Sequence, residues 1–242
     1  LPYWDMGKEY TKGSDGKELM LLAQINFEKM FQEAEKHELL PDTGMLQFFI
    51  ALDDVCGMDF DEQGEQRDFR VVYHESVNYQ LDEAQVKSLG MPVSTDGNLE
   101  EFTPIWTEMA LKITKQEVSM GEGDYRFSGI FQDIMQEKYG NKYEGGNLYQ
   151  ILGEDAYDKM EEEYPDGGHW LLGYPYFTQE DPRAYEERYR YYDTMLFQMD
   201  SDYGEGEDYI MWGDSGVGNF FINQEDLKKR DFSKILYNWD CC

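Results

Sequence analysis

The chain has 242 residues, and 51 acidic residues against 21 lysines and arginines give it a formal charge of −30. This charge excludes ordinary nucleic-acid binding, because the phosphates would repel the chain. It also opposes attachment to anionic lipid, and the longest apolar run, Met45 to Leu52, is too short to span a bilayer. Three cysteines without metal-type spacing are typical of a reducing compartment. We therefore expect a soluble, cytoplasmic protein that binds neither nucleic acid nor membranes.

The first third of the chain has the pattern strand, helix, strand, strand. Residues 21–26 form a short apolar run typical of a buried strand, and Asn26 is a favourable helix N-cap. Apolar residues then recur at helical spacing, and Pro41 stops this helix. The apolar runs at 45–50 and 69–74 predict two further strands.

The middle of the chain is richer in helical signals. Asp82 predicts a cap for a short helix over 82–90. Apolar and polar residues alternate from Met109 to Val118, which predicts a half-buried strand. Helical spacing returns over 127–135, and residues 147–163 predict a further helix with an acidic outer face.

The last third returns to strand patterns. Asn223 predicts a cap for a short helix over 224–229. The strands are expected at 170–177, 194–200, 209–213, 218–222 and 234–239.

Four segments of the last third match segments of the first third in the same order. Met20–Asn26 matches Thr194–Asp200, and Gln24 and Gln198 occupy the same place in the two. Three further pairs match: Leu46–Ile50 with Gly218–Ile222, Arg70–His74 more loosely with Ile235–Asn238, and Leu1–Trp4 with Tyr174–Phe177. This order predicts a duplication, since a solenoid needs at least about three short repeats.

The predicted fold class is α+β. We expect one compact domain over 1–242 with a duplicated, mainly antiparallel β core. Pseudo-repeat one covers 1–74, an α-rich insert covers 75–168, and pseudo-repeat two covers 169–242. If the repeats pair across a pseudo-twofold axis, Gln24 and Gln198 should lie near that axis.

Several motifs together resemble the bacterial YwqG-like family. They are Leu21–Asn26, Gly44–Ile50 with the following Asp53-Asp54 and Gly57–Asp59, Leu172–Tyr176, and Met211–Gly216. The resemblance implies a soluble α+β protein with a duplicated core, grouped as a domain of unknown function, and it implies no particular activity. Some members lie near toxin and immunity genes. Members usually carry a further segment before the Pro-Tyr motif, so we expect residues to be missing before Leu1.

Two acidic clusters are weak candidates for calcium. Asp59 and Asp61 begin a loop that resembles a calcium site, but Arg70 stands where a bidentate glutamate is required. Asp200 and Asp202 begin a second cluster, which continues to Glu205, Glu207 and Asp208. Acidic runs are mostly solvated turns. We therefore predict no metal site.

Two segments are candidates for binding small groups. In Trp212-Gly213-Asp214-Ser215-Gly216 the glycines can expose Asp214, and Trp212 can floor a pocket; an ordinary β-turn is the favoured alternative. Arg183 belongs to a basic and aromatic stretch that can hold an anion. Its alternative role is to pair with the surrounding carboxylates.

The charge favours an interaction protein that binds a basic protein, for example as an immunity-type inhibitor of a basic toxin. The alternative is a small-molecule or hydrolytic site in a cleft between the repeats. No nucleophile, base and orienting group can be named together, so an enzyme is disfavoured. No motif indicates a cofactor, and we expect none. The candidate binding residues are Gln24, Tyr174, Arg183, Gln198, Trp212 and Asp214.

Overall fold

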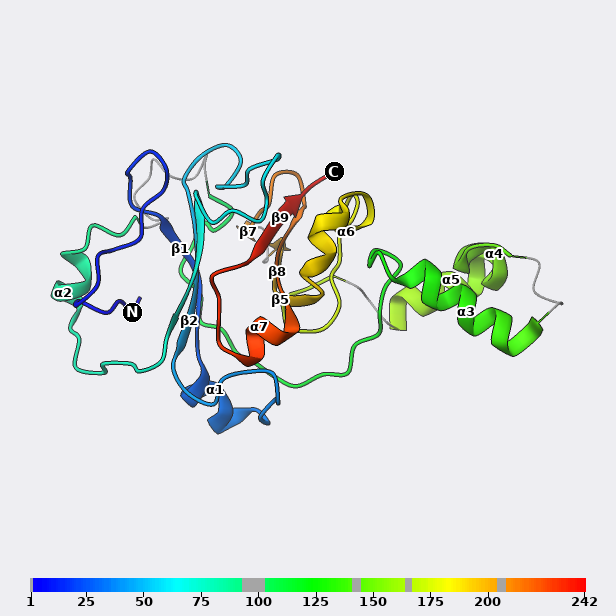
Figure 1. Cartoon of the computed structure of the whole chain (residues 1–242), viewed down its shortest axis with the longest axis horizontal. Helices are drawn as coiled ribbons and strands as arrows, with labels where there is room; N and C mark the ends of the chain where they lie inside the picture. The colour runs from blue at the N-terminus through cyan, green and yellow to red at the C-terminus, as the bar shows by residue number, and fades with distance from the viewer. Residues whose placement is uncertain (1, 93–102, 141–144, 164–166, 204–207) are drawn as a thin grey trace.

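The computed structural model describes residues 2–92, 103–140, 145–163, 167–203 and 208–242. It is a mixed α+β structure with antiparallel sheets, as the sequence predicts. Figure 1 shows two sheets side by side, with a group of helices extending from one end. Among the described residues, no helix is both long and apolar enough to cross a membrane.

The first sheet has the order β1-β2-β3. Its strands are β1 (Met20–Asn26), β2 (Met45–Ile50) and β3 (Phe69–His74). Helix α1 (Phe27–Glu33) follows β1 directly, because the Asn26 side chain accepts a hydrogen bond from the Lys29 amide at 3.0 Å. The predicted order of elements is confirmed, although α1 ends well before Pro41.

The second sheet has the order β4-β5-β8-β9. Its strands are β4 (Trp170–Leu171), β5 (Thr194–Asp200), β8 (Val217–Ile222) and β9 (Leu236–Asp240). Helix α7 (Gln224–Lys228) begins after Asn223, as predicted. A separate two-stranded ribbon pairs β6 (Asp202–Tyr203) with β7 (Asp208–Ile210).

The two sheets pack face to face through aromatic rings. The Phe48 ring of β2 lies 4.6 Å from the Phe197 ring of β5 and 5.0 Å from the Phe220 ring of β8, centroid to centroid. Phe69 of β3 lies 5.0 Å from Tyr237 of β9. Aromatic side chains bury large apolar areas, so this contact forms the centre of the core.

The outer face of each sheet is covered by the chain that leads into its first long strand, before β1 in the first sheet and between β4 and β5 in the second. Trp4 and Tyr10 pack on Phe49 of β2. On the other side, Phe177 packs on Phe221 of β8 with the rings 6.0 Å apart. The second cover also contains α6 (Pro182–Tyr185) and the 3₁₀ helix η3 (Glu187–Tyr191), which the sequence did not predict. The predicted strand over 170–177 is wrong beyond Leu171, because this segment crosses the sheet as a cover.

Each sheet holds its cover by a side-chain carboxamide. In the first sheet the Tyr3 amide donates to Gln24 Oε1 at 3.0 Å, and Gln47 Nε2 donates to the Tyr3 carbonyl at 2.7 Å. Gln24 and Gln47 are directly paired across β1 and β2. The glutamine pair therefore binds the backbone of Tyr3 as a neighbouring strand would.

The second sheet repeats this arrangement. The Tyr176 amide donates to Gln198 Oε1 at 2.7 Å, and Asn219 Nδ2 donates to the Tyr176 carbonyl at 2.8 Å. Gln198 and Asn219 are paired across β5 and β8. Strands β1 and β5 also carry a register shift at equivalent places, between Leu21 and Ala23 in β1 and between Met195 and Phe197 in β5.

Gln24 and Gln198 do not meet at a common axis, so that prediction is wrong. They lie on different sheets, and each binds the cover on the outer face of its own sheet. Side chains alternate along a strand, so the core positions of Ala23 and Ile25 turn Gln24 outward. In the most loosely matched pair of segments, Val72 lies opposite Gln47 and Asn238 lies opposite Asn219.

The insert contains short helices and irregular chain. Helix α2 (Glu83–Lys87) has the predicted Asp82 cap with a full capping box. The predicted strand from Met109 to Val118 is wrong, since this segment has no strand pairing within the described residues. Helix α3 (Phe127–Tyr139) is confirmed. The predicted helix over 147–163 is two helices, α4 (Leu148–Leu152) and α5 (Glu154–Glu163), because Gly153 has a φ of 75°.

We expect Phe48→Ala to lower the free energy of unfolding by about 3–5 kcal/mol, because it leaves a cavity between the sheets. Phe60→Ala is the control, since Phe60 is 72% exposed, and its cost should stay within about 0.5 kcal/mol. Urea unfolding of both variants measures this difference. Similar costs for the two would contradict the assignment of Phe48 to the core.

Candidate functional site

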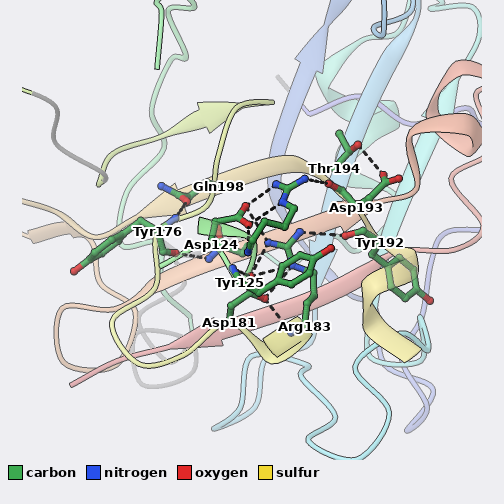
Figure 2. Close-up of polar contacts among 11 residues, drawn as sticks. Asp124, Tyr125, Tyr176, Asp181, Arg183, Tyr192, Asp193, Thr194 and Gln198 are labelled. Atoms are coloured by element: carbon green, nitrogen blue, oxygen red, sulfur yellow. Dashed lines mark hydrogen bonds and ion pairs between the residues drawn. The ribbon is translucent and has the colours of Figure 1, made fainter. Parts of the chain in front are cut away.

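Arg183 lies at the centre of a buried ion cluster, drawn in Figure 2. Its Nη2 atom lies 2.8 Å from Asp181 Oδ2 and 3.5 Å from Asp124 Oδ2. The guanidinium carbon lies 4.2 Å from the centre of the Phe221 ring on the outer face of the second sheet. All three charged side chains are almost fully excluded from water. A buried cation requires such partners, because an unpaired charge is costly to desolvate.

Asp181 and Asp124 also organise the backbone around the cluster. Asp181 is the N-cap of α6 and accepts the Arg183 amide at 2.9 Å. Its Oδ2 atom also accepts the Tyr125 amide at 3.0 Å. Tyr125 lies just before α3, so Asp181 links the chain that enters α3 to the cover of the second sheet.

Arg126 completes the cluster on its more exposed side. Its Nη2 atom donates to Asp124 Oδ2 at 2.6 Å, and its Nε atom donates to Oδ1 at 2.8 Å. Burial would raise the pKa of Asp124, but the hydrogen bonds from Arg126 and the charges of Arg183 and Arg126 outweigh burial and lower that pKa below its ordinary value. Asp124 is therefore ionised at neutral pH.

This geometry decides between the two interpretations of Arg183. The guanidinium binds Asp181 and Asp124 and also donates to the Tyr192 carbonyl at 3.2 Å. It therefore has the carboxylate-pairing role instead of facing an external anion. Sequence reasoning missed both carboxylates, although the Asp181-Pro182 pair is a recognisable helix start.

The segment at 212–216 is half core and half surface. Trp212 is fully buried between the sheets and cannot floor an open pocket. Asp214 lies exposed in the following turn. The Ser215 hydroxyl hydrogen-bonds the Tyr203 hydroxyl.

The six candidate binding residues are not brought together. Gln24 lies on the outer face of the first sheet, and Gln198 on that of the second. Tyr174 is half-buried with its ring 5.9 Å from the Arg126 guanidinium carbon. Trp212 is in the core and Asp214 is in a surface turn, so the predicted cleft is not built from these residues.

The calcium candidates are engaged in turns. Asp59 Oδ1 accepts the Asp61 amide at 2.9 Å, and Asp59 Oδ2 pairs with Arg67 at 2.6 Å. Asp200 Oδ2 accepts the Gly168 amide at 2.6 Å, and Asp202 lies 3.6 Å from His169. Across the described residues, no three His, Cys, Asp or Glu side chains gather as metal ligands would. Glu205 and Glu207 lie outside these residues.

A pocket of about 470 Å³ lies at the end of β3. His74 borders it, and Gln47 fixes the tautomer of His74: Gln47 Nε2 donates to Tyr3, so its Oε1 accepts from His74 Nε2 at 2.9 Å. Burial lowers the pKa of His74 to about 4, so the ring is neutral at neutral pH. The pocket is lined by Asp5, Lys8, Tyr73, His74, Glu75, Ser76, Arg230 and Phe232, none of which the sequence singled out as binding residues.

Helices α3, α4 and α5 form a group that stands away from both sheets (Figure 1). Neither α3 nor α4 contains a buried residue. We call their exposed apolar side chains the insert face. It consists of Ile130, Ile134, Tyr149, Ile151 and Leu152.

Helix α5, which packs against α4, is strongly acidic. Helix α5 has the sequence EDAYDKMEEE, with six acidic residues and one lysine. The Tyr149 and Tyr157 rings lie 5.4 Å apart and hold α4 against α5. The Tyr157 hydroxyl donates to Glu122 at 2.8 Å, which links α5 to the chain before α3. The arrangement can therefore present apolar and negative groups together.

Comparison with known proteins gives a family but no activity. The profile of a domain of unknown function, DUF1963, matches residues 1–241. The chain belongs to this family. No curated protein matches the chain. The function of this DUF1963 domain is therefore inferred from its own residues.

We expect Arg183→Met to lower the free energy of unfolding by about 3–5 kcal/mol, because Asp181 and Asp124 would lose their buried cation. Arg188→Met is the control, since the Arg188 side chain is 48% exposed where it pairs with Glu62, and its cost should stay under about 1 kcal/mol. Thermal and urea unfolding measure both. Equal effects would show that burial of Arg183 is not decisive.

His74 gives a pH dependence of known sign. Its pKa is about 4 when folded against an ordinary 6.5, so the unfolded chain binds the extra proton and stability falls as pH drops through this window. Between about pH 7 and pH 5, the wild type should lose about 2 kcal/mol more than His74→Gln. Urea unfolding at both pH values measures the loss. Equal losses would contradict a buried neutral His74.

Proposed function

We propose that this DUF1963 domain, as a YwqG-like member of its family, is an acidic interaction module that binds a basic protein. The observation that carries the proposal is the imbalance of charge. Even if each of the 21 lysines and arginines paired with one carboxylate, 51 − 21 = 30 carboxylates would remain. Two of the 21 basic residues, Arg183 and Arg126, pair with Asp124 in the buried cluster.

A charge of this size acts mainly on association. A cationic partner is attracted over a distance set by the ionic strength, so encounter is fast at low salt and slower at high salt. Charge complementarity also rejects acidic competitors. An immunity-type inhibitor of a basic toxin domain has these physical requirements, and we propose this role as one form of the function.

The alternative, a small-molecule or hydrolytic site, has less support. Burial, followed by the nearby charges of Asp53 and Asp54, raises the pKa of Cys56 to about 12, so its thiol stays protonated and poorly nucleophilic. Ser215 contacts the Tyr203 hydroxyl, and no histidine among the described residues hydrogen-bonds it. The pocket beside His74 is the feature that favours small-molecule binding.

We also infer that the two sheets descend from an internal duplication of one half-domain. The support is the repeated use of a carboxamide pair to hold the preceding tyrosine, through Gln24 and Gln47 on one side and Gln198 and Asn219 on the other. The register shifts at equivalent places in β1 and β5 support it further. Independent origins would not be expected to reproduce both features.

We expect affinity capture with this chain at low salt to recover a basic protein whose association rate constant falls at least about tenfold between about 0.05 and 0.5 M salt. The identified partner is purified, and both rate constants are measured by surface plasmon resonance. An acidic partner, or an association rate that ignores salt, would overturn the proposal.

A further inference from the structure

We infer that the insert face on α3 and α4, with the carboxylates of α5, is the docking surface for a basic amphipathic helix of the partner protein. This inference rests on the proposed function and names the surface through which it acts. It depends on three features of the insert: exposed apolar side chains on α3 and α4, a strong negative charge, and helices too short to be stable without packing.

The apolar stripe of α3 is only partly covered within the described residues, because Phe127 and Phe131 are half-buried whereas Ile130 and Ile134 are exposed. Phe127, Ile130, Phe131 and Ile134 recur at the spacing that places side chains on one side of a helix. Ile130 is 45% exposed and Ile134 is 54% exposed. Such a stripe normally packs against a core, whereas no residue of α3 is buried. Exposed apolar surface of this kind marks an interaction site.

The charge around the insert face selects the occupant. In α5, Glu154, Asp155, Asp158 and Glu162 are exposed. Asp133 and Glu137 on α3 are also exposed and make no ion pair with any residue that the structure describes. A second copy of the chain would bring another charge of −30 and the same acidic helices, so self-association is opposed. A cationic partner gains from each carboxylate near its docking site.

The helical spacing of the apolar side chains on α3 favours a helix as the partner. An amphipathic helix binds by laying apolar residues at i, i+3 or i+4, and i+7 against apolar side chains of another protein. Lysines and arginines beside that stripe would then face the carboxylates of α5. The half-buried Met135 and Met160 have flexible side chains that can adapt to different apolar partners.

Docking should also stabilise the insert. Helices α3, α4 and α5 have 13, 5 and 10 residues, and isolated helices shorter than about 12–15 residues are marginal in water. Their attachment to the sheets relies on the ion cluster of Asp124 and Arg183 at the start of α3. A partner helix would supply the packing that these helices lack, so their amides should exchange more slowly in the complex.

The probe for the test is a synthetic peptide of about 18 residues, built from leucine and lysine with the leucines on one helical face. A peptide of the same composition without a helical face is its control. We expect the amphipathic peptide to bind more tightly and to slow hydrogen exchange in α3–α5 while leaving the two sheets unchanged. Fluorescence anisotropy measures the affinity.

Two double variants locate the site. Ile130→Gln/Ile134→Gln removes apolar surface, and Asp158→Lys/Glu162→Lys reverses charge on α5; each should weaken peptide binding at least about tenfold. The matched controls are Phe60→Gln/Leu111→Gln and Glu9→Lys/Glu33→Lys, which make the same changes at exposed residues outside the three helices. The controls should change the affinity less than about threefold. Thermal unfolding checks that every variant folds.

The outcomes separate this inference from the proposed function. Salt-sensitive peptide binding that the insert variants and controls weaken equally would overturn the insert face as the site, while the proposed function would stand. Absence of peptide binding at low salt would also overturn the inference. The proposed function is tested separately, by the salt dependence of the association rate constant of the captured basic protein. A dimer in analytical ultracentrifugation that Ile130→Gln/Ile134→Gln abolishes would assign the face to a second copy and overturn the inference.

Discussion

The placement of the helical insert depends on the burial of Arg183 between Asp181 and Asp124. The three charges lie on the outer face of the second sheet, against the Phe221 ring. Asp181 belongs to the cover of that sheet, whereas Asp124 belongs to the chain that enters α3. A buried ion pair gives little net stability over an apolar equivalent, but loss of one member is costly. In this protein the ion cluster determines that the chain entering α3 packs on the cover of the second sheet.

A second constraint is the carboxamide pairs on the outer faces. Two carboxamides paired across neighbouring strands bind the amide and the carbonyl of one tyrosine, and together they act as a short piece of extra strand. Gln47 and Gln198 are fully buried for this reason. Gln198 is satisfied by the backbone of Tyr176 and Gly168, and Gln47 by the Tyr3 carbonyl and the His74 ring, so the cost of burying them is offset. The covers are thereby held in register with the sheets, and the aromatic rings of Trp4 and Phe177 are placed on Phe49 and Phe221.

Much of the sheet structure could be predicted from local patterns. Asn26 and Asn223 cap the helices that follow β1 and β8, and the apolar runs that contain Gln24 and Gln198 predicted both long strands. Local sequence patterns did not predict the structure correctly where tertiary contacts determine it. Alternation from Met109 to Val118 resembles a strand, but no neighbouring strand pairs with it among the described residues. Only Ile113 of that run packs against the core.

The candidate site was harder to predict, because charged residues read from sequence are assigned to the surface. Arg183 is within a stretch of arginines and tyrosines, yet it is fully buried while its neighbour Arg188 is exposed. The difference comes from Asp124, which lies far away in the sequence and is supplied by the insert. For Trp212 the expected role was to floor a pocket, whereas its ring packs on Gly218 inside the core.

The division of charge within the molecule follows from these contacts. The sheets exclude nearly all ionised groups from their shared core, so the acidic excess must lie on the covers, turns and insert helices. In α5 the carboxylates repel one another at helical spacing, and the one lysine cannot offset six acids. Outside its two packed sheets the chain therefore has helices that carry exposed apolar side chains together with carboxylates that make no ion pair among the described residues. A ligand with positive charge beside an apolar stripe would reduce the repulsion among the carboxylates and would also cover the exposed apolar side chains. The charge and the apolar surface of the insert therefore serve one function.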